Sequence, residues 1–361
     1  MTNSCDILVS GTGSFGGRIA LDIAATAREP VHVVVAGRNR DRLSWLVTAG
    51  NARASLFGTP ARFSAYEVDL LSDGASDRMI ADVAPRIVAQ AASVQTSQVI
   101  ANRDNAWARL VAEGGLSVTA VSQAILSVRV ADAISRAGRD VAFFNCGFPD
   151  VVNGIIRALG HPVVSGFGNI AILSNAFCGQ EEIETGRLKM LAHYQNLAAF
   201  RLTPDERDGV PPRVWIDGVE VDDVYARFRH VRLTREPAIE ISGATGVPLL
   251  LALAAGKPWS GHMPGPDGRP GGYPVRLDGG ELLLDLPQGV SEADAVAFNR
   301  AFEETNGMVV EDGGYVRFAG RLSEALGQHD EGLRHGFDVH DLEEIFQRFE
   351  SLRAGLGRQT S

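Results

Sequence analysis

Residues 6–40 form one continuous pattern that constrains the fold more than any other part of the chain. The apolar run Ile7-Leu8-Val9 leads into the turn Gly11-Thr12-Gly13-Ser14-Phe15-Gly16, and an amphipathic stretch then leads to a second apolar run at residues 31–36. A G-x-G-x-x-G motif alone is weak evidence. Here it follows an expected strand and opens an expected helix within a unit of about 30 residues, which is the context the motif requires. We therefore expect a β-α-β unit that binds a dinucleotide.

The three glycines of this turn have separate roles in such a unit. Gly11 permits the tight turn, Gly13 lets the backbone approach a pyrophosphate, and Gly16 lets the helix pack closely against the strand. The exposed N–H groups and the helix dipole favour a bound phosphate. We expect residues 11–16, with Thr12, Ser14 and Phe15 between the glycines, to contact the cofactor.

The segment after the second apolar run indicates which dinucleotide is bound. NAD sites place Asp or Glu at the end of this strand, whereas this chain has Arg38-Asn39-Arg40 after Gly37. A guanidinium matches a 2′-phosphate bidentately. We therefore expect NADP(H), bound by Arg38, Asn39 and Arg40. The alternative is that the two arginines are solvated side chains before a helix that Asp41 caps.

Length and composition limit the class of protein. A chain of 361 residues fits two domains, and its hydrophobic content of 45% and charged content of 22% are those of an ordinary globular protein. The net charge of −10 argues against a general nucleic-acid binder. We find no apolar run long enough for a membrane span and no secretion signal, so we expect a cytoplasmic protein that acts on a small molecule.

The cysteines and histidines give no metal site. Cys5, Cys146 and Cys178 lack paired spacing, and the three histidines near the end of the chain lack the spacing of ligands on one helix face. We expect neither a disulfide framework nor a bound metal.

Strands and helices alternate to about residue 148. After the first two strands we expect strands at residues 61–70, 86–92, 116–122 and 140–146, separated by helices at 78–83, 95–113 and 124–136. Six such strands predict an α/β fold with a doubly wound parallel (Rossmann) sheet in a dinucleotide-binding domain of residues 1–148. Ligands bind beyond the carboxyl ends of such strands. The expected cofactor contacts there are Asp69, Ala92, Ser93, Ser122, Cys146 and Gly147.

The pattern changes after that point to a mixed α+β domain, which we place at residues 149–330 and assign to substrate binding and dimerisation. We expect strands at residues 163–173, 213–217, 228–231, 238–242 and 281–286, and helices at 181–200, 248–255 and 292–305. Residues 243–265 either stay in this domain or pack back on the first. Residues 331–361 are expected to carry a C-terminal helix, whose apolar face includes Leu342, Ile345 and Phe346.

Three segments in this order resemble the saccharopine dehydrogenase-like family of NADP-linked oxidoreductases. They are the glycine turn with Ala36-Gly37-Arg38 and Val68-Asp69-Leu70, the stretch from Asn145 to Asn153, and the stretch from Thr245-Gly246-Val247-Pro248 to Pro264. The resemblance implies chemistry at a carbon–nitrogen bond. The reaction would be reduction of an imine formed from an amino acid or amine and an oxo acid or aldehyde, or its reverse. The family also suggests a homodimer formed through the sheet of the second domain.

Hydride transfer needs a proton donor or acceptor beside the nicotinamide. The catalytic candidates are His262, which titrates near neutral pH, Lys257, which could hold a carboxylate or donate a proton, and Asp150, which could orient a substrate ammonium. The alternatives are helix capping by Asp150 and a helix-terminal role for Lys257. We expect the Pro- and Gly-rich residues 257–274 to form a loop over the mouth of the site. His193 and Tyr194, on an expected helix, rank below His262.

Substrate contacts are expected from both domains. The Thr245-Gly246 turn at a helix start suits a carboxylate, although simple capping would also explain it. Asn153 could bind substrate or contact backbone in its own helix. The expected substrate-binding residues are Phe148, Asn153, Thr245, Gly246 and Tyr273.

Two other functions stay open. A sugar or polyol dehydrogenase shares the two-domain layout, but that group usually carries Glu-Lys-Pro where this chain has Ser122-Gln123-Ala124. A non-catalytic dinucleotide sensor would need less than the second domain provides.

Overall fold

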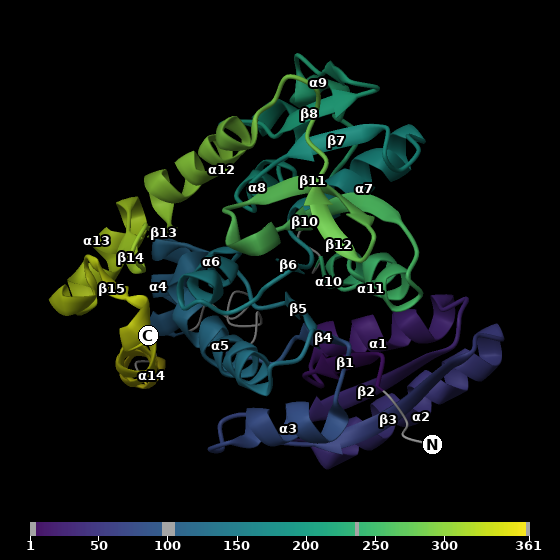
Figure 1. Ribbon diagram of the computed structural model, residues 1–361. Helices are drawn as coiled ribbons and strands as arrows, with labels where there is room; N and C mark the ends of the chain where they lie inside the picture. The colour runs from purple at the N-terminus through teal and green to yellow at the C-terminus, as the bar shows by residue number, and fades with distance from the viewer. Residues whose placement is uncertain (1–4, 96–104, 235–237, 359–361) are drawn as a thin grey trace.

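The fold is built around a six-stranded parallel sheet (Figure 1). The structure, a computed structural model, describes residues 5–95, 105–234 and 238–358. The sheet order is β3-β2-β1-β4-β5-β6, so the order reverses between β1 and β4 and creates a switch point at their carboxyl ends. The strands are β1 (Ile7–Ser10), β2 (Val31–Gly37), β3 (Ala61–Glu67), β4 (Ile87–Gln90), β5 (Ala142–Asn145) and β6 (Ser165–Gly166). The predicted doubly wound sheet is confirmed.

Continuous apolar runs form these strands because helices cover both faces of the sheet. In β2, Val33 and Val35 pack into one core while Val34 and Ala36 pack into the core on the opposite face. One core also contains residues of α1 (Ser14–Thr26) and α2 (Arg40–Phe57), and the other contains residues of α3 (Ala75–Val83), α5 (Ala120–Ala137) and α6 (Val151–Ala158).

The expected strand at residues 116–122 is wrong. These residues form the 3-10 helix η2 (Leu116–Thr119) and the first turn of α5. A short apolar run that is buried on all sides does not distinguish a strand from a core helix. Residues 116–137 are also long and apolar enough to cross a membrane by composition, but 83% of the most apolar window is buried, as expected of a core helix. The sixth strand of the sheet is β6, far beyond residue 148.

The second region contains two antiparallel sheets of three strands each. One consists of β7 (Leu188–Leu191), β8 (Arg213–Ile216) and β9 (Val219–Glu220), and the other of β10 (Trp259–Pro264), β11 (Gly272–Asp278) and β12 (Glu281–Leu284). A bridge between Ala192 and Gly272 joins them. Shorter elements complete this region: α7 (Ile170–Glu181), α8 (Asn196–Ala199), η3 (Pro204–Glu206), α9 (Val224–Arg227), α10 (Ile239–Ser242), α11 (Val247–Ala254), η4 (Pro266–Gly268) and α12 (Glu292–Asn306).

Several expectations for this region are corrected. The expected strand at residues 163–173 contains only the short strand β6 and then the start of α7, and the expected strand at 238–242 is the helix α10. Residues 228–231 follow α9 without forming a strand. The expected helix at residues 181–200 contains β7 instead. Residues 257–274 form the β10–β11 hairpin rather than an open loop. The strands near 213–217 and 281–286 and the helices near 248–255 and 292–305 are confirmed.

The C-terminal part packs beside the parallel sheet rather than on the second region (Figure 1). The amphipathic helix α14 buries Leu342, Ile345 and Phe346 in the core that contains α5, so the predicted apolar face docks on its own chain. The elements of this part are β13 (Met308–Val310), β14 (Tyr315–Phe318), α13 (Gly320–His329), η5 (Glu331–Leu333), β15 (Gly336–Asp338), η6 (Val339–Asp341) and α14 (Leu342–Gly357), with α4 (Ala106–Gly114) beneath them. The start of the expected helix at 95–113 lies outside the described residues.

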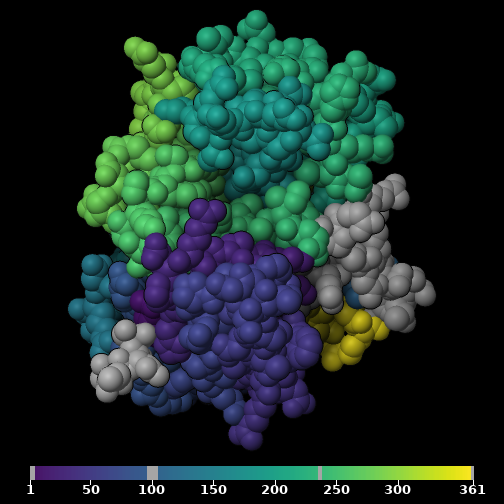
Figure 2. All heavy atoms as spheres, turned by 90° about the vertical axis from the view of Figure 1, so that its right-hand side faces the viewer, coloured from purple at the N-terminus to yellow at the C-terminus, as the bar shows by residue number. Residues whose placement is uncertain are grey.

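The two cores of the parallel sheet draw residues from both sides of residue 148. Val247 and Leu250 of α11 and Met263 of β10 share a core with Ile7 and Val9 of β1. In Figure 2 the N-terminal residues, in purple, directly adjoin the green second region. A third core lies within the second region, where the rings of Phe177 and Phe228 stack at 3.9 Å.

Candidate functional site

The turn between β1 and α1 has the geometry that a bound pyrophosphate requires. Gly11 has φ 119°, and a Cβ there would lie 2.5 Å from the backbone nitrogen of Ala92. A Cβ on Gly16 would lie 2.0 Å from the carbonyl oxygen of Gly11, so helix and turn touch. Gly13 is exposed, and a Cβ there would meet nothing within 4 Å among the described residues. Backbone packing thus demands glycine at the first and last positions, and the middle one leaves room for a ligand.

The first turn of α1 suits an anion. Within the described chain, no side chain caps this helix and no acidic residue stands in its first turn. Ser14 is exposed there, whereas Phe15 packs against the core. Thr12 holds the turn against the neighbouring strand, because a Cβ on Gly37 would lie 2.8 Å from its methyl group. The residues of the turn therefore fit a dinucleotide.

Of the three residues after β2, Arg38 alone is free to bind a ligand through its charge. It is exposed and makes no hydrogen bond or ion pair with the described residues. Arg40 donates from Nε to Glu67 Oε2 at 2.6 Å. Asn39 is the N-cap of α2 and accepts from the backbone N–H of Arg42 at 2.9 Å, so the expectation that Asp41 caps this helix is wrong.

Sequence reasoning missed Arg42. Its Nε donates to the carbonyl oxygen of Thr12 at 3.1 Å and so ties α2 to the glycine turn. A signal was present, since Arg42 lies in the first turn of the helix that directly follows Arg38 and Asn39.

The loops after β3 and β4 form part of the same edge. Ala92 lies against Gly11, as the close approach of its backbone nitrogen shows. Asp69 is exposed and accepts from the N–H of Leu71 at 3.1 Å, and Ser93 donates to the carbonyl oxygen of Gln95 at 2.6 Å. The side chains of Asp69 and Ser93 therefore stabilise their own loops. The part of this edge that contacts the glycine turn is the backbone of Ala92.

Ser122 does not belong to this edge. It lies in α5, fully buried, and its hydroxyl donates to Glu350 of α14 at 3.2 Å. The prediction that Ser122 contacts the cofactor is wrong because the strand that would have placed it is a helix.

The end of β5 forms a wall beside the switch point. Cys146, Gly147 and Phe148 follow this strand and are half-buried. The Asn145 side chain holds their backbone, because its Oδ1 accepts from the N–H of Gly147 at 2.9 Å. Burial raises the pKa of the Cys146 thiol, so it remains a neutral wall residue.

Asn153 holds this wall from behind and is not available to a substrate. Its Oδ1 accepts from Asn145 Nδ2 at 2.7 Å, and its own Nδ2 donates to the carbonyl oxygen of Gly265 at 3.0 Å. Of the two roles expected for Asn153, the backbone contact made from its helix is the one that these hydrogen bonds support.

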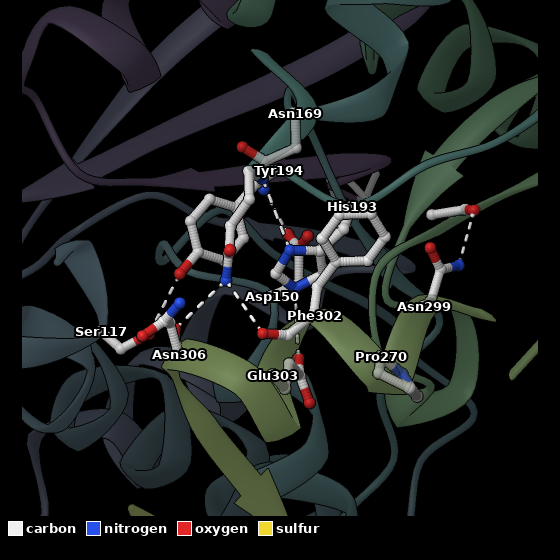
Figure 3. A network of polar contacts seen from close by, with 12 residues as sticks. Ser117, Asp150, Asn169, His193, Tyr194, Pro270, Asn299, Phe302, Glu303 and Asn306 are labelled. Atoms are coloured by element: carbon white, nitrogen blue, oxygen red, sulfur yellow. Dashed lines mark hydrogen bonds and ion pairs between the residues drawn. The ribbon is translucent and has the colours of Figure 1, made fainter. Parts of the chain in front are cut away.

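Beyond this wall lies a buried cluster of three titratable side chains, Asp150, His193 and Glu303 (Figure 3). Asp150, at the start of α6, accepts from Asn169 Nδ2 through Oδ1, while Oδ2 has no partner among the described residues. His193 follows β7, and its Nε2 lies 3.6 Å from Glu303 Oε1 of α12. Each of the three side chains is less than 8% exposed.

Burial sets the protonation of this cluster. Removal from water raises the pKa of Asp150 to about 7 and that of Glu303 to about 8, because the charged carboxylates lose solvation. The same effect lowers the pKa of His193 to about 4. The charge of His193 lowers the pKa of Asp150 and that of Glu303 raises it, so the three groups act on one another. Near neutral pH the imidazole is uncharged and Asp150 can both take and give a proton.

Aromatic rings connect the cluster to the wall. The ring of His193 stacks on Phe302 at 5.3 Å, and the ring of Tyr194 lies 4.4 Å from that of His193 and 5.1 Å from that of Phe148. The hydroxyl of Tyr194 shares a hydrogen bond of 3.1 Å with Ser117. Phe148 therefore reaches the cluster through the ring of Tyr194, and its role as a substrate contact stays a prediction.

Sequence reasoning missed Glu303 and ranked His193 below His262, because His193 was expected on a helix. A signal for Glu303 existed: Ala295, Asn299 and Glu303 are the buried positions of α12 and recur every four residues, so an acid occupies the buried face of the helix.

The other two catalytic candidates lie elsewhere. His262 is buried in β10, and the charges that act on its pKa are those of Asp285 and Lys189 rather than those of the cluster. Burial lowers the pKa of His262 to about 3. Lys257 is exposed and pairs with Glu29 at 2.6 Å. Glu29 lies just before β2 begins, so this ion pair is at the opposite end of the sheet from the glycine turn. His262 belongs to the β10–β11 hairpin rather than to a loop over the site, and Lys257 lies just before that hairpin.

Three expected substrate contacts serve packing instead. The hydroxyl of Thr245 accepts from the N–H of Gly168 and donates to the carbonyl oxygen of Ser242, both at 2.9 Å. A Cβ on Gly246 would lie 2.4 Å from the ring of Phe167. Tyr273 is fully buried and donates to the carbonyl oxygen of Pro270 at 2.7 Å. Among the described residues, no group of histidine, cysteine and acidic side chains could hold a metal ion.

Comparison with known proteins supports the fold and leaves the family open. No protein-family model and no curated sequence matches the chain. Lactate dehydrogenase from Cryptosporidium parvum, solved with lactic acid and nicotinamide adenine dinucleotide, matches with a TM-score of 0.50 at 13% identity over 96% of this chain and 99% of that one. Malate dehydrogenase from the same organism matches with a TM-score of 0.50 at 13% identity, over 83% and 96% of the two chains. Malate dehydrogenase from Picrophilus torridus matches with a TM-score of 0.50 at 10% identity, over 96% and 98%.

At these identities the shared feature is the fold: a Rossmann sheet joined to an antiparallel α+β region. The chain therefore has a two-domain fold that dehydrogenases also use. Its resemblance to the saccharopine dehydrogenase-like family stays a prediction.

Proposed function

We propose that this chain is an NADP(H)-dependent oxidoreductase that acts at a carbon–nitrogen bond. It would reduce an imine formed from an amine or amino acid and an oxo acid or aldehyde, or catalyse the reverse oxidation. The observation that carries the proposal is the buried cluster of Asp150, His193 and Glu303. It lies beyond β5, the strand next to β4, and the loop after β4 packs against the glycine turn.

The cofactor part rests on the glycine turn and Arg38. The backbone of Gly11 and Gly13 would hold the pyrophosphate, and Cys146 and Gly147 would border the nicotinamide. Arg38, directly after β2, is exposed and has no hydrogen bond or ion pair with the described residues, so it is available to a 2′-phosphate. The bound cofactor would supply the hydride.

The charge of the cluster favours a substrate nitrogen. Two buried carboxyl groups flank a neutral imidazole, and no lysine or arginine of the described residues hydrogen-bonds to either of them. An iminium or ammonium ion would bring the positive charge that Asp150 needs in order to ionise. A hydroxy acid brings no positive charge to this place, so the cluster favours a nitrogen substrate over the lactate- and malate-type reactions.

Asp150 is the group best placed to meet the substrate nitrogen. Asn169 fixes one of its oxygens and leaves Oδ2 free. With its pKa raised to about 7 by burial, it can protonate a nitrogen in one direction and accept a proton in the other. The rings of Tyr194 and Phe148 would exclude water from this position.

The test is turnover with defined substrate pairs. We would measure oxidation of NADPH by the purified protein with amines or amino acids mixed with oxo acids or aldehydes, and identify the products by mass spectrometry. The proposal predicts a secondary amine that forms only when both partners are present. Reduction of an oxo acid or a sugar without an amine would overturn the carbon–nitrogen assignment, and cofactor binding without turnover on any pair would indicate a sensor.

A further inference from the structure

Asn169 adopts a backbone conformation that a residue with a side chain rarely takes. It lies in the turn that joins β6 to α7, with φ 43° and ψ −114°, and Gly168 before it has φ 87°. Positive φ brings Cβ too close to the backbone, and asparagine tolerates it mainly where ψ is positive as well. The backbone of this turn therefore favours glycine at position 169.

The side chain of Asn169 does not serve its own helix. Asn169 is the N-cap residue of α7, where asparagine usually accepts from an N–H of the first turn, but it makes no such bond among the described residues. Its Nδ2 instead donates to Asp150 Oδ1 at the start of α6 (Figure 3). The hydrogen bond to Asp150 is thus what asparagine provides at this position and glycine would not.

The backbone around Asn169 is held on both sides. The N–H of Gly168 donates to Thr245 Oγ1 at 2.9 Å. The carbonyl oxygens of Gly168 and Asn169 accept from the N–H groups of Ala171 and Ile172, both at 2.9 Å. Because the backbone of the donor is fixed in this way, its amide holds Asp150 Oδ1 in one place.

This hydrogen bond acts on both the orientation and the charge of Asp150. Asp150 is 5% exposed, and with Oδ1 held its Oδ2 is left without a partner among the described residues. Burial raises the pKa of Asp150 and the charge of Glu303 adds to this, whereas the charge of His193 and the hydrogen bond from Asn169 lower it. The pKa of Tyr194, also in this cluster, is raised by burial to about 12, so its hydroxyl stays neutral. In the described chain Asn169 is the one hydrogen-bond donor to this carboxyl group.

We propose that Asn169 is a positioning residue: its amide orients the Asp150 carboxyl group so that Oδ2 meets the substrate nitrogen, and it stabilises the ionised form of that group. This inference rests on the proposed function, in which Asp150 exchanges a proton with the nitrogen. Asn169 transfers no proton itself and acts through Asp150. Without its amide, the buried acid would hold its proton more tightly and in a less defined orientation.

The chain offers variants that remove this contact without disturbing the turn. Asn169→Gly deletes the donor and suits the backbone conformation, so the Tm should stay close to that of the wild type. Asn169→Asp keeps the size of the side chain and puts a second acid where the donor was. Glu182→Gly is the matched control, because Glu182 follows the other end of α7, is exposed and also has a positive φ, 52°.

The first measurement is the pKa of Asp150 in the apoprotein, followed by NMR with ¹³C-labelled aspartate and assigned through Asp150→Asn. In Asn169→Gly this pKa should rise by about one unit or more, because a hydrogen bond to the charged form is lost. In Asn169→Asp two acids share the site, so the higher of their two apparent pKa values should rise further. Glu182→Gly should leave the pKa unchanged. An unchanged pKa in both Asn169 variants would overturn the proposal.

The second measurement is the pH profile of kcat for NADPH oxidation with an amine and an oxo acid or aldehyde. Reduction needs protonated Asp150, so the alkaline limb should move to higher pH in Asn169→Gly, in the same direction as the pKa. The maximal kcat should fall about tenfold or more because the carboxyl group is no longer oriented, while the Kd for NADPH stays the same. A lower kcat with an unshifted profile would also overturn the proposal.

Failure of the proposed function has a different signature. The wild type would then oxidise no NADPH with any such pair. The pKa of Asp150 in the apoprotein would still decide whether Asn169 controls this carboxyl group, because that measurement needs neither cofactor nor substrate.

Discussion

His193 Nε2 and Glu303 Oε1 lie 3.6 Å apart in the interior of the protein, although one residue follows β7 and the other belongs to α12. Asp150, from the start of α6, completes the cluster. Three segments far apart in the sequence thus bring two acids and an imidazole together at the carboxyl end of the parallel sheet. Unpaired buried acids are expensive, and such groups cluster at functional sites.

Asp150→Asn should abolish most of the turnover without affecting the cofactor. Asparagine can still accept from Asn169 but cannot exchange a proton, so kcat should fall by about 10²–10⁴. The Kd for NADPH should stay at the wild-type value, measured by fluorescence titration. Asp267→Asn, at an exposed aspartate that pairs with Arg157, is the control. A wild-type kcat in Asp150→Asn would remove this residue from the mechanism.

The free energy of unfolding should decrease between about pH 6.5 and pH 8. Asp150 and Glu303 have folded-state pKa values of about 7 and about 8, above those of the unfolded chain. Between the unfolded and folded pKa values the native state therefore binds more protons, and stability falls as pH rises. His193 and His262, with pKa values lowered to about 4 and about 3, have the opposite effect, but only below the unfolded histidine pKa of about 6.5.

Above that pH the two acids act alone among these four groups. Urea titrations at several pH values measure the effect, and Glu303→Gln should flatten the decline. A free energy of unfolding that rises from pH 6.5 to pH 8 would contradict the protonation assigned to the cluster.

Thr245→Val should lower stability and leave ligand binding intact. The substitution leaves the buried N–H of Gly168 without its acceptor, which costs about 1–3 kcal/mol. Thermal unfolding measures this loss, and the KM of the oxo acid or aldehyde should not change. A raised KM with an unchanged Tm would show instead that Thr245 binds the substrate carboxylate, as the sequence suggested.

Two buried histidines provide a direct comparison. His193→Ala should lower kcat by about 10²–10⁴ if His193 transfers protons, whereas His262→Ala should retain the wild-type kcat, because its electrostatic neighbours are Lys189 and Asp285. Both variants create cavities and lose stability, so thermal unfolding of each identifies the folded fraction. Loss of turnover in folded His262→Ala alone would reverse these assignments.

The parallel sheet was predictable because its signals are local. The run at β2 is apolar at every position from Val33 to Ala36 since both faces are buried, and the roles of Gly11 and Gly16 follow from backbone contacts within the turn. The error at residues 116–122 has a physical cause. An apolar run that is buried on all sides has the same pattern in a central strand and in a core helix, so only the tertiary packing determines which of the two forms.

The cluster was less predictable because its members meet only through tertiary structure. Asp150 was identified from its position after a strand, whereas His193 and Glu303 depend on how β7 and α12 pack. His262 illustrates the opposite error. A histidine in a Pro- and Gly-rich segment suggests an exposed loop, but the segment pairs as the β10–β11 hairpin and buries it.

Calorimetry of cofactor binding tests the central claim most directly. The wild type should bind NADPH more tightly than NADH, and Arg38→Ala should weaken NADPH binding about 10–100-fold, the value of a charge-assisted contact, with little effect on NADH. Arg40→Ala is the control, because Arg40 already pairs with Glu67. Equal weakening of both cofactors by Arg38→Ala, or no heat with either cofactor in the wild type, would contradict the account.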